Sequence, residues 1–140
     1  MEAVIMLGFL MILSVEDIRW KEVHSILLYA FLTSGIVVWF IRGQVTFYEF
    51  AGGIACGGML WIISQIMPEK LGNADGIVFA ATGAYLGLLH NLFLMMVSMI
   101  LAGLGSLVAV VILRRSGDDT MPLIPYIAAG QAVIMIMEGR

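Results

Sequence analysis

Two aspartates, Asp17 and Asp75, combine a residue type suited to acid–base chemistry with positions at the ends of long apolar runs. A charged side chain at the centre of a membrane helix costs about 2.5–3.5 kcal/mol, so acids at membrane depth are candidates for function. Two carboxyl groups held close together cannot both ionise, and the pair keeps one proton. The ionised member can then activate a water while the protonated member donates to a carbonyl, which is aspartic-peptidase chemistry.

The apolar runs predict where each carboxyl group lies. Residues 3–15 are free of charge, but these 13 residues extend only about 20 Å as a helix. A bilayer core is roughly 30 Å thick, so a helix that crosses it must continue through Glu16 and Asp17. Asp75 comes just before the apolar run that begins at Ile77, which puts it in the first turn of a helix.

The composition requires a membrane around these helices. Of the 140 residues, 61% are hydrophobic and only 12% are charged, whereas soluble domains are about 45–50% apolar and about 25% charged. A soluble fold of this length has too little interior to bury so much apolar surface. We therefore expect an all-α integral membrane protein with residues 1–140 forming a single domain. The net charge of −3 and the absence of basic tracts argue against a nucleic-acid partner.

Charges and turn residues divide the chain into apolar runs that predict six transmembrane helices. The expected spans are 2–18, 23–41, 47–67, 73–89, 92–113 and 122–137. Two spans separate the end of the first from the start of the fourth, so Asp17 and Asp75 should lie on the same side of the membrane. Small-residue pairs, Gly53 with Gly57 and Gly83 with Gly87, predict close helix packing.

Lysines and arginines in the short connections set the expected orientation. The side that holds both aspartates carries Arg19, Lys21, Lys70, Arg114 and Arg115. The other side carries only Arg42 and Arg140. Positive residues concentrate in cytoplasmic loops, so we expect an active site facing the cytoplasm and both termini outside the cytoplasm.

Two questions about the pair stay open in the sequence. Neighbouring helical residues point about 100° apart, so only one of Glu16 and Asp17 can face the fourth span. For the second acid, Asn73 is an expected N-cap, and a negative charge is favoured at a helix N-terminus. Because Asp17 lies instead near a helix C-terminus, we hypothesise that Asp75 is ionised and Asp17 protonated.

Other reactive side chains form no rival site. His24 and His90 are expected at opposite membrane faces, so they cannot share a metal, and the single Cys56 cannot form an intrachain disulfide. We expect no metal and no cofactor. Asp118 and Asp119 follow a glycine and two arginines, which indicates a solvated loop.

Three segments resemble the type IV prepilin peptidase and preflagellin peptidase family. Residues 72–75, Gly-Asn-Ala-Asp, and residues 80–87 resemble its GxGD segment and the small-residue stretch that follows. Residues 17–19, Asp-Ile-Arg, resemble its first aspartate motif, and residues 122–130 resemble its final helix. Four positions depart from the family pattern: Ala74 and Ile124 replace glycines, Ile77 replaces a lysine, and Glu22-Val23-His24 replaces an Ile-Pro-Asn-like end.

The resemblance implies a six-helix membrane protease in which Asp17 and Asp75 are catalytic. It assigns Gly72, Asn73 and Ala74 to the active-site turn. Glu16 and Arg19, beside the first aspartate, are candidates for contacting substrate or supporting the pair.

The resemblance also implies a substrate, the basic leader of a pilin-like or flagellin-like precursor, cut just after a glycine on the cytoplasmic side of the cell membrane. The chain looks like the compact members of the family, without the N-terminal extension with paired cysteines, so N-methylation of the product is not expected. Two other functions remain possible from the residues alone. One is an ion- or proton-coupled transporter with the same acids as a relay, and the other is a non-catalytic assembly subunit.

Overall fold

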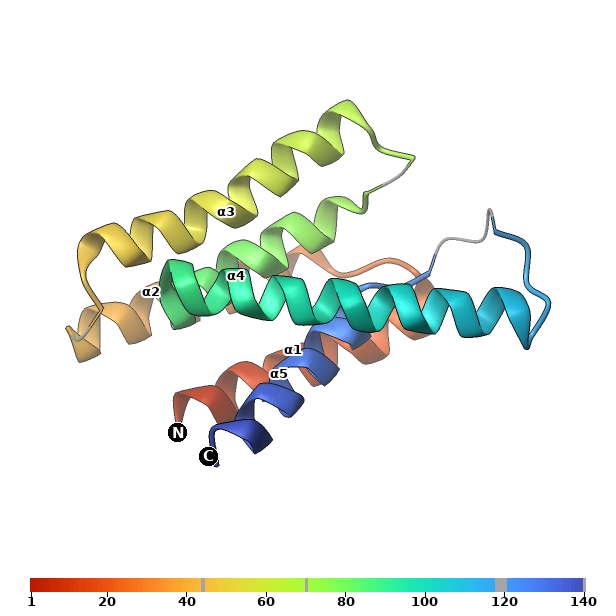
Figure 1. Cartoon of the computed structure of the whole chain (residues 1–140). Coiled ribbons are helices and arrows are strands. Elements are labelled where there is room, and N and C mark those ends of the chain that lie inside the picture. Colours follow the sequence, from red (N-terminus) through yellow and green to blue (C-terminus); the bar gives the residue numbers. More distant parts are fainter. Residues whose placement is uncertain (44, 70, 118–120, 140) are drawn as a thin grey trace.

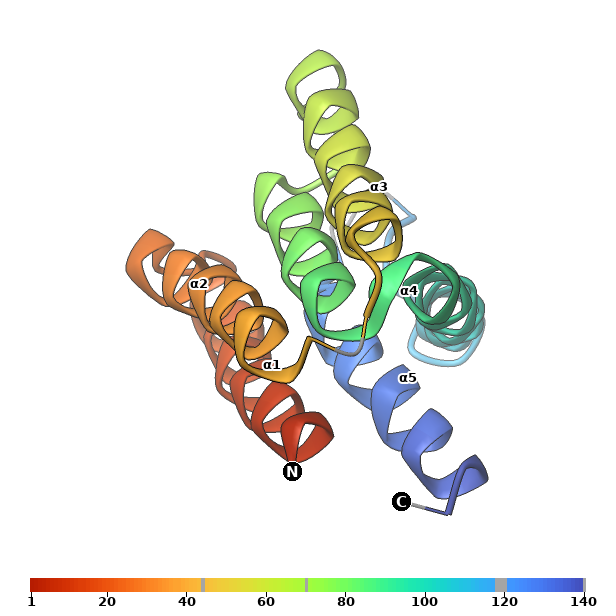
Figure 2. The same cartoon turned by 90° about the vertical axis from the view of Figure 1, so that its left-hand side faces the viewer.

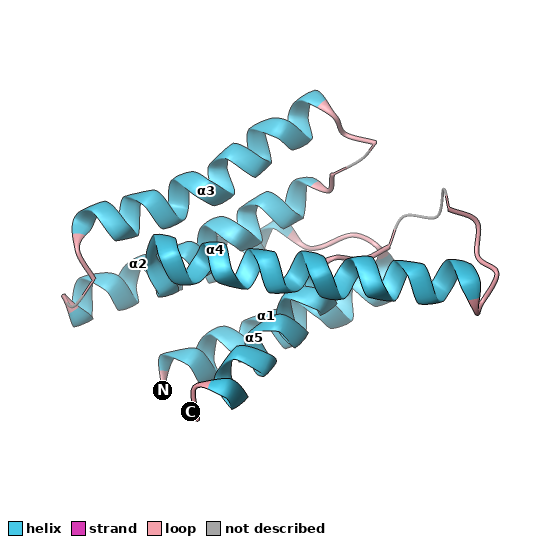
Figure 3. Ribbon diagram, viewed as in Figure 1, coloured by secondary structure: helices cyan, strands magenta, loops and turns pink. Residues whose placement is uncertain are grey.

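The protein is entirely helical wherever it is described. The computed structural model describes residues 1–43, 45–69, 71–117 and 121–139, and these contain helices and connections but no strand (Figure 3). The helices are α1 (Glu2–Trp20), α2 (Ser25–Arg42), α3 (Phe47–Ile66), α4 (Asn73–Val111) and α5 (Ile124–Met137). In length and composition, α2, α3 and α4 can each cross a membrane, while α5 is apolar but shorter. The all-α prediction is confirmed.

Helix α4 reverses direction at Gly87. The backbone there has φ 76° and ψ 178°, and it divides α4 into a first arm, residues 73–86, and a second arm, residues 88–111. The second arm runs back along the bundle, as Figures 1 and 2 show. The sequence placed this break later, near residue 90, and treated Gly87 as a packing residue. The break thus falls a few residues earlier than expected, at a residue type that alone adopts this backbone conformation readily.

A buried amide holds the two arms and α3 together. Asn91 in the second arm accepts a hydrogen bond from Thr82 Oγ1 at 2.7 Å through its Oδ1. Its Nδ2 donates to the carbonyl oxygens of Phe79 at 3.0 Å and Gly53 at 3.3 Å. Both Asn91 and Thr82 are fully buried. Lipid offers no hydrogen-bond partners, so these polar side chains must find theirs inside the protein.

Helix α3 packs directly against the first arm of α4 through glycines. A Cβ added to Gly53 or Gly57 would collide with the backbone of Gly83 or Ala80 on α4. Such close approach lets two helices associate in lipid, where apolar surface alone provides little driving force. The packing predicted for Gly53, Gly57 and Gly83 is therefore confirmed.

The interior and the surface are both apolar. Large side chains from α1, α2, both arms of α4 and α5 form the core; the fully buried ones are Met6, Leu10, Leu13, Phe31, Val78, Phe79, Leu94, Ile124 and Ile127. Large apolar side chains are also exposed along the outside, including Ile26, Phe40, Ile66, Ile112 and Ile136. An outer surface of this kind fits hydrocarbon better than water.

The connections sort to the two ends of the bundle. Those between α1 and α2, α3 and α4, and α4 and α5 lie toward one end, while the N-terminus, the C-terminus and the α2–α3 connection lie toward the other (Figure 1). The end of α1 and the start of α4 therefore meet at the same end, as the number of intervening helices predicted.

Candidate active site

Asp17 lies in the last turn of α1, where the sequence placed it. The helix continues to Trp20 and ends when Lys21 adopts the left-handed conformation, with φ 53°. The N–H of Lys21 donates to the carbonyl oxygen of Asp17 at 3.1 Å. Helix α1 thus carries both Glu16 and Asp17 to the edge of the bundle.

Asp75 lies in the first turn of α4, and Gly72 makes room for its side chain. Gly72 is the N-cap residue and has an extended backbone, with φ −72° and ψ 136°. The N–H of Asp75 donates to the Gly72 carbonyl oxygen at 3.2 Å. A Cβ at Gly72 would lie 3.0 Å from Asp75 Oδ2. The backbone does not require glycine here, because any residue can adopt this φ; what glycine provides is space beside the carboxylate.

Ala74, which stands where the family pattern has glycine, fits the turn without strain. It lies inside the first turn of α4, and φ is negative there. Its methyl group is half-buried and packs against the core cluster. Alanine is therefore compatible with this geometry.

The side chain of Asn73 anchors the start of α4 to α3. It occupies the first position of α4, not the N-cap, and no side chain caps this helix N-terminus, so the N-cap prediction is wrong. Its Oδ1 instead accepts hydrogen bonds from Ser64 Oγ at 2.8 Å and Gln65 Nε2 at 2.9 Å. Ser64 and Gln65 were not predicted as site residues, although two adjacent polar residues near the end of an apolar run are a usable signal.

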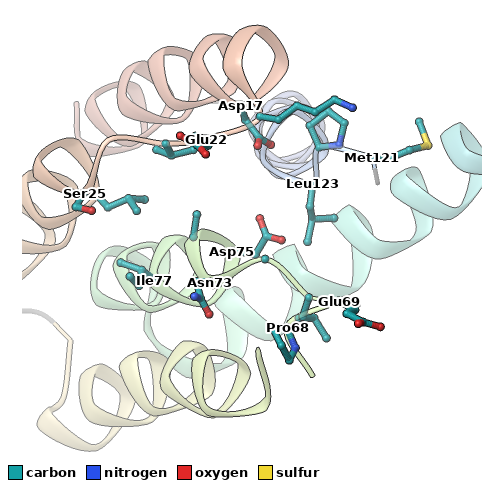
Figure 4. A pocket seen from close by; sticks show the side chains of 17 residues that line it. Asp17, Glu22, Ser25, Pro68, Glu69, Asn73, Asp75, Ile77, Met121 and Leu123 are labelled. Atoms are coloured by element: carbon teal, nitrogen blue, oxygen red, sulfur yellow. The ribbon is translucent and has the colours of Figure 1, made fainter. Parts of the chain in front are cut away.

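The two carboxyl groups face each other across a cavity of about 650 Å³ (Figure 4). Asp17 points into it from α1 and Asp75 from α4, close enough for the charge of Asp17 to act on Asp75. Gly72, Asn73 and Ala74 also line this cavity. Most of the remaining lining residues come from the three connections at this end, including Lys21, Glu22, Pro68, Glu69, Met121, Pro122 and Leu123. The others are Ser25 and Leu28 of α2 and Ile77 of α4.

The two other predicted side chains point elsewhere. Glu16 turns toward the start of α2, where its Oε2 accepts the N–H of His24 at 3.2 Å and its Oε1 lies 3.2 Å from His24 Nδ1. Arg19 is exposed, with its guanidinium 5.6 Å from the centre of the Trp20 ring. Neither residue lines the cavity. Of the adjacent acids, Asp17 is thus the one that faces α4.

Helix α5 supplies a contact that the sequence argument missed. The main-chain N–H of Ile124 donates to Asp17 Oδ2 at 3.4 Å. Asp17 therefore lies at the N-terminus of α5 as well as near the C-terminus of α1. The hypothesis that Asp75 is the ionised acid assumed that only Asp75 lies at a helix N-terminus. Because each carboxylate lies at a helix N-terminus, this assumption does not hold.

The remaining acids do not add to a metal site. Within the described ranges, no three His, Cys, Asp or Glu side chains come together in a way that could hold a metal ion. Asp118 and Asp119, expected in a solvated loop, lie outside the described residues.

Two carboxyl groups facing a shared cavity can together hold a water and polarise a carbonyl. Comparison with known proteins points the same way. The family model described as the type IV leader peptidase family matches residues 4–110, a range that contains α2, α3, both aspartates and nearly all of α1 and α4. No curated protein and no solved structure matches the chain.

Proposed function

Because the chain belongs to the type IV leader peptidase family, we propose that it is a membrane aspartic endopeptidase that removes the basic leader of a pilin-like or flagellin-like precursor. Asp17 and Asp75 form its catalytic pair. The observation that carries the proposal is the facing of these two carboxyl groups across one cavity. Gly72, Asn73 and Ala74 form the turn that presents the second aspartate.

The pair hydrolyses the peptide bond while holding one proton in total. The ionised carboxylate takes a proton from a water, whose oxygen bonds to the carbonyl carbon, and the protonated carboxyl gives its proton to the carbonyl oxygen. The tetrahedral intermediate then collapses. The first carboxyl protonates the departing nitrogen as the carbon–nitrogen bond breaks, a hydroxyl proton of the intermediate returns to the second, and the pair again holds one proton.

The proposed topology has six crossings: α1, α2, α3, the two arms of α4, and α5. The described cations in or beside the connections at the aspartate end are Arg19, Lys21, Arg114 and Arg115, whereas Arg42 lies at the other end. This asymmetry supports a cytoplasmic active site and outward-facing termini. Lys70 and Arg140, which also entered the charge count, lie outside the described residues.

The charges at the cavity suit a basic substrate. Glu22 and Glu69 are exposed at its rim beside the aspartates (Figure 4), with Lys21 the one cation among the described lining residues. Excess negative charge around a cleft raises the local concentration of a cationic ligand. This supports the basic leader as the segment that enters.

The deciding test is cleavage of a candidate precursor by the purified protein in lipid. We expect Asp17→Asn and Asp75→Asn each to lower kcat by about a thousandfold or more, since a single carboxyl cannot serve as both base and acid. Glu16→Gln is the matched control and should cleave normally, because Glu16 contacts His24 outside the cavity.

The same variants separate the rival functions. A non-catalytic assembly subunit predicts that no precursor is cleaved by any version of the protein. A proton-coupled transporter predicts that both Asp→Asn variants abolish solute-driven proton uptake into vesicles. Normal cleavage by either Asp→Asn variant would refute the proposed catalytic pair.

A further inference from the structure

Helix α5 reaches the proposed catalytic pair through its backbone, although it lies beyond the segment that matches the family model. The Ile124 N–H donates to Asp17 Oδ2 at 3.4 Å, and this is the main-chain contact recorded for that carboxylate. We propose that the Ile124 N–H is a positioning group that holds the Asp17 carboxylate in place for catalysis. This inference rests on the proposed function.

The sequence of α5 leaves Ile124 as the available donor in its first turn. Pro125, the next residue, has no N–H. The N–H groups of Tyr126 and Ile127 both donate to the carbonyl oxygen of Leu123, at 2.9 Å and 3.1 Å. A helix normally begins with several unused N–H groups. Here only that of Ile124 is directed at Asp17.

The donor is held rigidly. The Ile124 side chain is fully buried, and Ile127 and Ala128 follow it into the core between α1 and α4. Pro122 and Leu123 continue from the same helix start into the cavity wall. Movement of the Ile124 N–H relative to Asp17 would therefore require α5 to leave its packing against α1.

The contact offsets an unfavourable electrostatic environment around the Asp17 carboxylate. Asp17 lies in the last turn of α1, where the carbonyl ends of the peptide units disfavour a negative charge. The start of α5 brings the opposite partial charge to the same carboxylate. An N–H donor also fixes the direction of one oxygen, which leaves the other free for water.

The test removes this N–H in two ways whose side effects differ. Ile124→Pro lacks the N–H, and Ile124→Ala is its truncated control. The side effect of the proline is strain at Leu123, whose φ of −86° and ψ of −32° are disfavoured before proline. A main-chain ester made with the α-hydroxy analogue of valine also lacks it, and Ile124→Val is its control. In the proline variant the Leu123 carbonyl remains an amide carbonyl and a strong acceptor, whereas the ester weakens it. The ester form has the same side chain as its valine control, whereas proline differs from alanine in its ring. The defect that both forms share is the missing N–H.

Each protein is measured for kcat and KM in lipid vesicles. We expect the proline and ester forms to show kcat about tenfold below their own controls with KM unchanged, because hydrogen bonds to charged groups are the stronger class. A kcat within twofold of the control, or a loss confined to KM, would overturn the inference. If the proline form does not fold, the ester form decides alone. Failure of the unmodified protein to cleave would instead refute the proposed function.

Discussion

At the scale of single residues, the site depends on which atoms surround each carboxylate. Gly72 leaves the space that the Asp75 carboxylate occupies, and Asn73 ties the same turn to α3 through Ser64 and Gln65. Glu16 accepts a hydrogen bond from the His24 N–H at the start of α2, so its side chain points away from the cavity that Asp17 faces. The residues next to each aspartate in the sequence thus help to determine where the two acids point.

Gly72→Ala should impair catalysis more than folding. The new Cβ would lie 3.0 Å from Asp75 Oδ2 and displace the carboxylate, while φ −72° suits alanine. At this distance the carboxylate must shift by a few tenths of an ångström. A misplacement of about 1 Å can cost roughly a hundredfold in rate, so we expect the smaller shift to lower kcat by about three- to tenfold. Steady-state cleavage assays in lipid measure it.

Ala74→Gly provides the control for that substitution. It restores the glycine of the family pattern at a helical position that alanine already fits, so kcat should change by less than about threefold. Equal activity of Gly72→Ala and the parent protein would show that the carboxylate does not depend on this space.

At the scale of elements, the reversal inside α4 decides how the bundle closes. Gly87 turns the chain, and Asn91 joins the second arm to the first arm and to α3. The first arm carries Asp75 at its start, so the reversal also keeps α4 from extending straight out of the bundle. A continuous helix would remove the second arm from its contact with α5.

Gly87→Ala should therefore destabilise the fold. Nothing lies closer than 3.4 Å to the added Cβ, so the cost comes from the backbone conformation, φ 76° and ψ 178°. Such a conformation costs a residue with a side chain about 1–3 kcal/mol. Equilibrium unfolding in mixed micelles should show a loss of this size.

Gly103→Ala is the matched control in the second arm. Gly103 is helical and an added Cβ there meets nothing within 4 Å, so alanine should leave stability unchanged or raise it slightly. The interpretation of Gly87 fails if the two substitutions shift the unfolding free energy equally.

At the scale of the whole molecule, the two helices between the aspartates, α2 and α3, bring both carboxyl groups to one end of the bundle. The three connections that line the cavity lie at that end, and the termini lie at the other (Figure 1). A peptidase built this way opens to one aqueous side, and the outer apolar surface belongs in lipid.

Thiol labelling can test the proposed orientation. In a Cys56→Ala background, Glu69→Cys reports the cavity end and Tyr48→Cys reports the opposite end; both side chains are exposed. With right-side-out vesicles and a membrane-impermeant reagent, we expect Tyr48→Cys to react and Glu69→Cys to react only after permeabilisation. Immediate labelling of Glu69→Cys with protection of Tyr48→Cys would reverse the topology.

The sequence by itself determined the class of fold and the ends of the bundle. Composition required lipid, and the shortness of residues 3–15 required α1 to continue through Asp17. Because two predicted helices separate Asp17 from Asp75, both residues were expected at the same end of the bundle. These conclusions depend on helix rise, membrane thickness and the cost of buried charge, which are the same in any fold.

Only the tertiary structure decided which side chains meet. It turned Glu16 toward His24, moved the reversal to Gly87, replaced the Asn73 cap with an anchor to Ser64, and brought the Ile124 N–H to Asp17. These contacts join residues from different helices, and helix period and apolar length carry no information about the rotation of one helix against another. Packing of glycines and buried side chains sets that rotation, and with it the geometry of the aspartate pair.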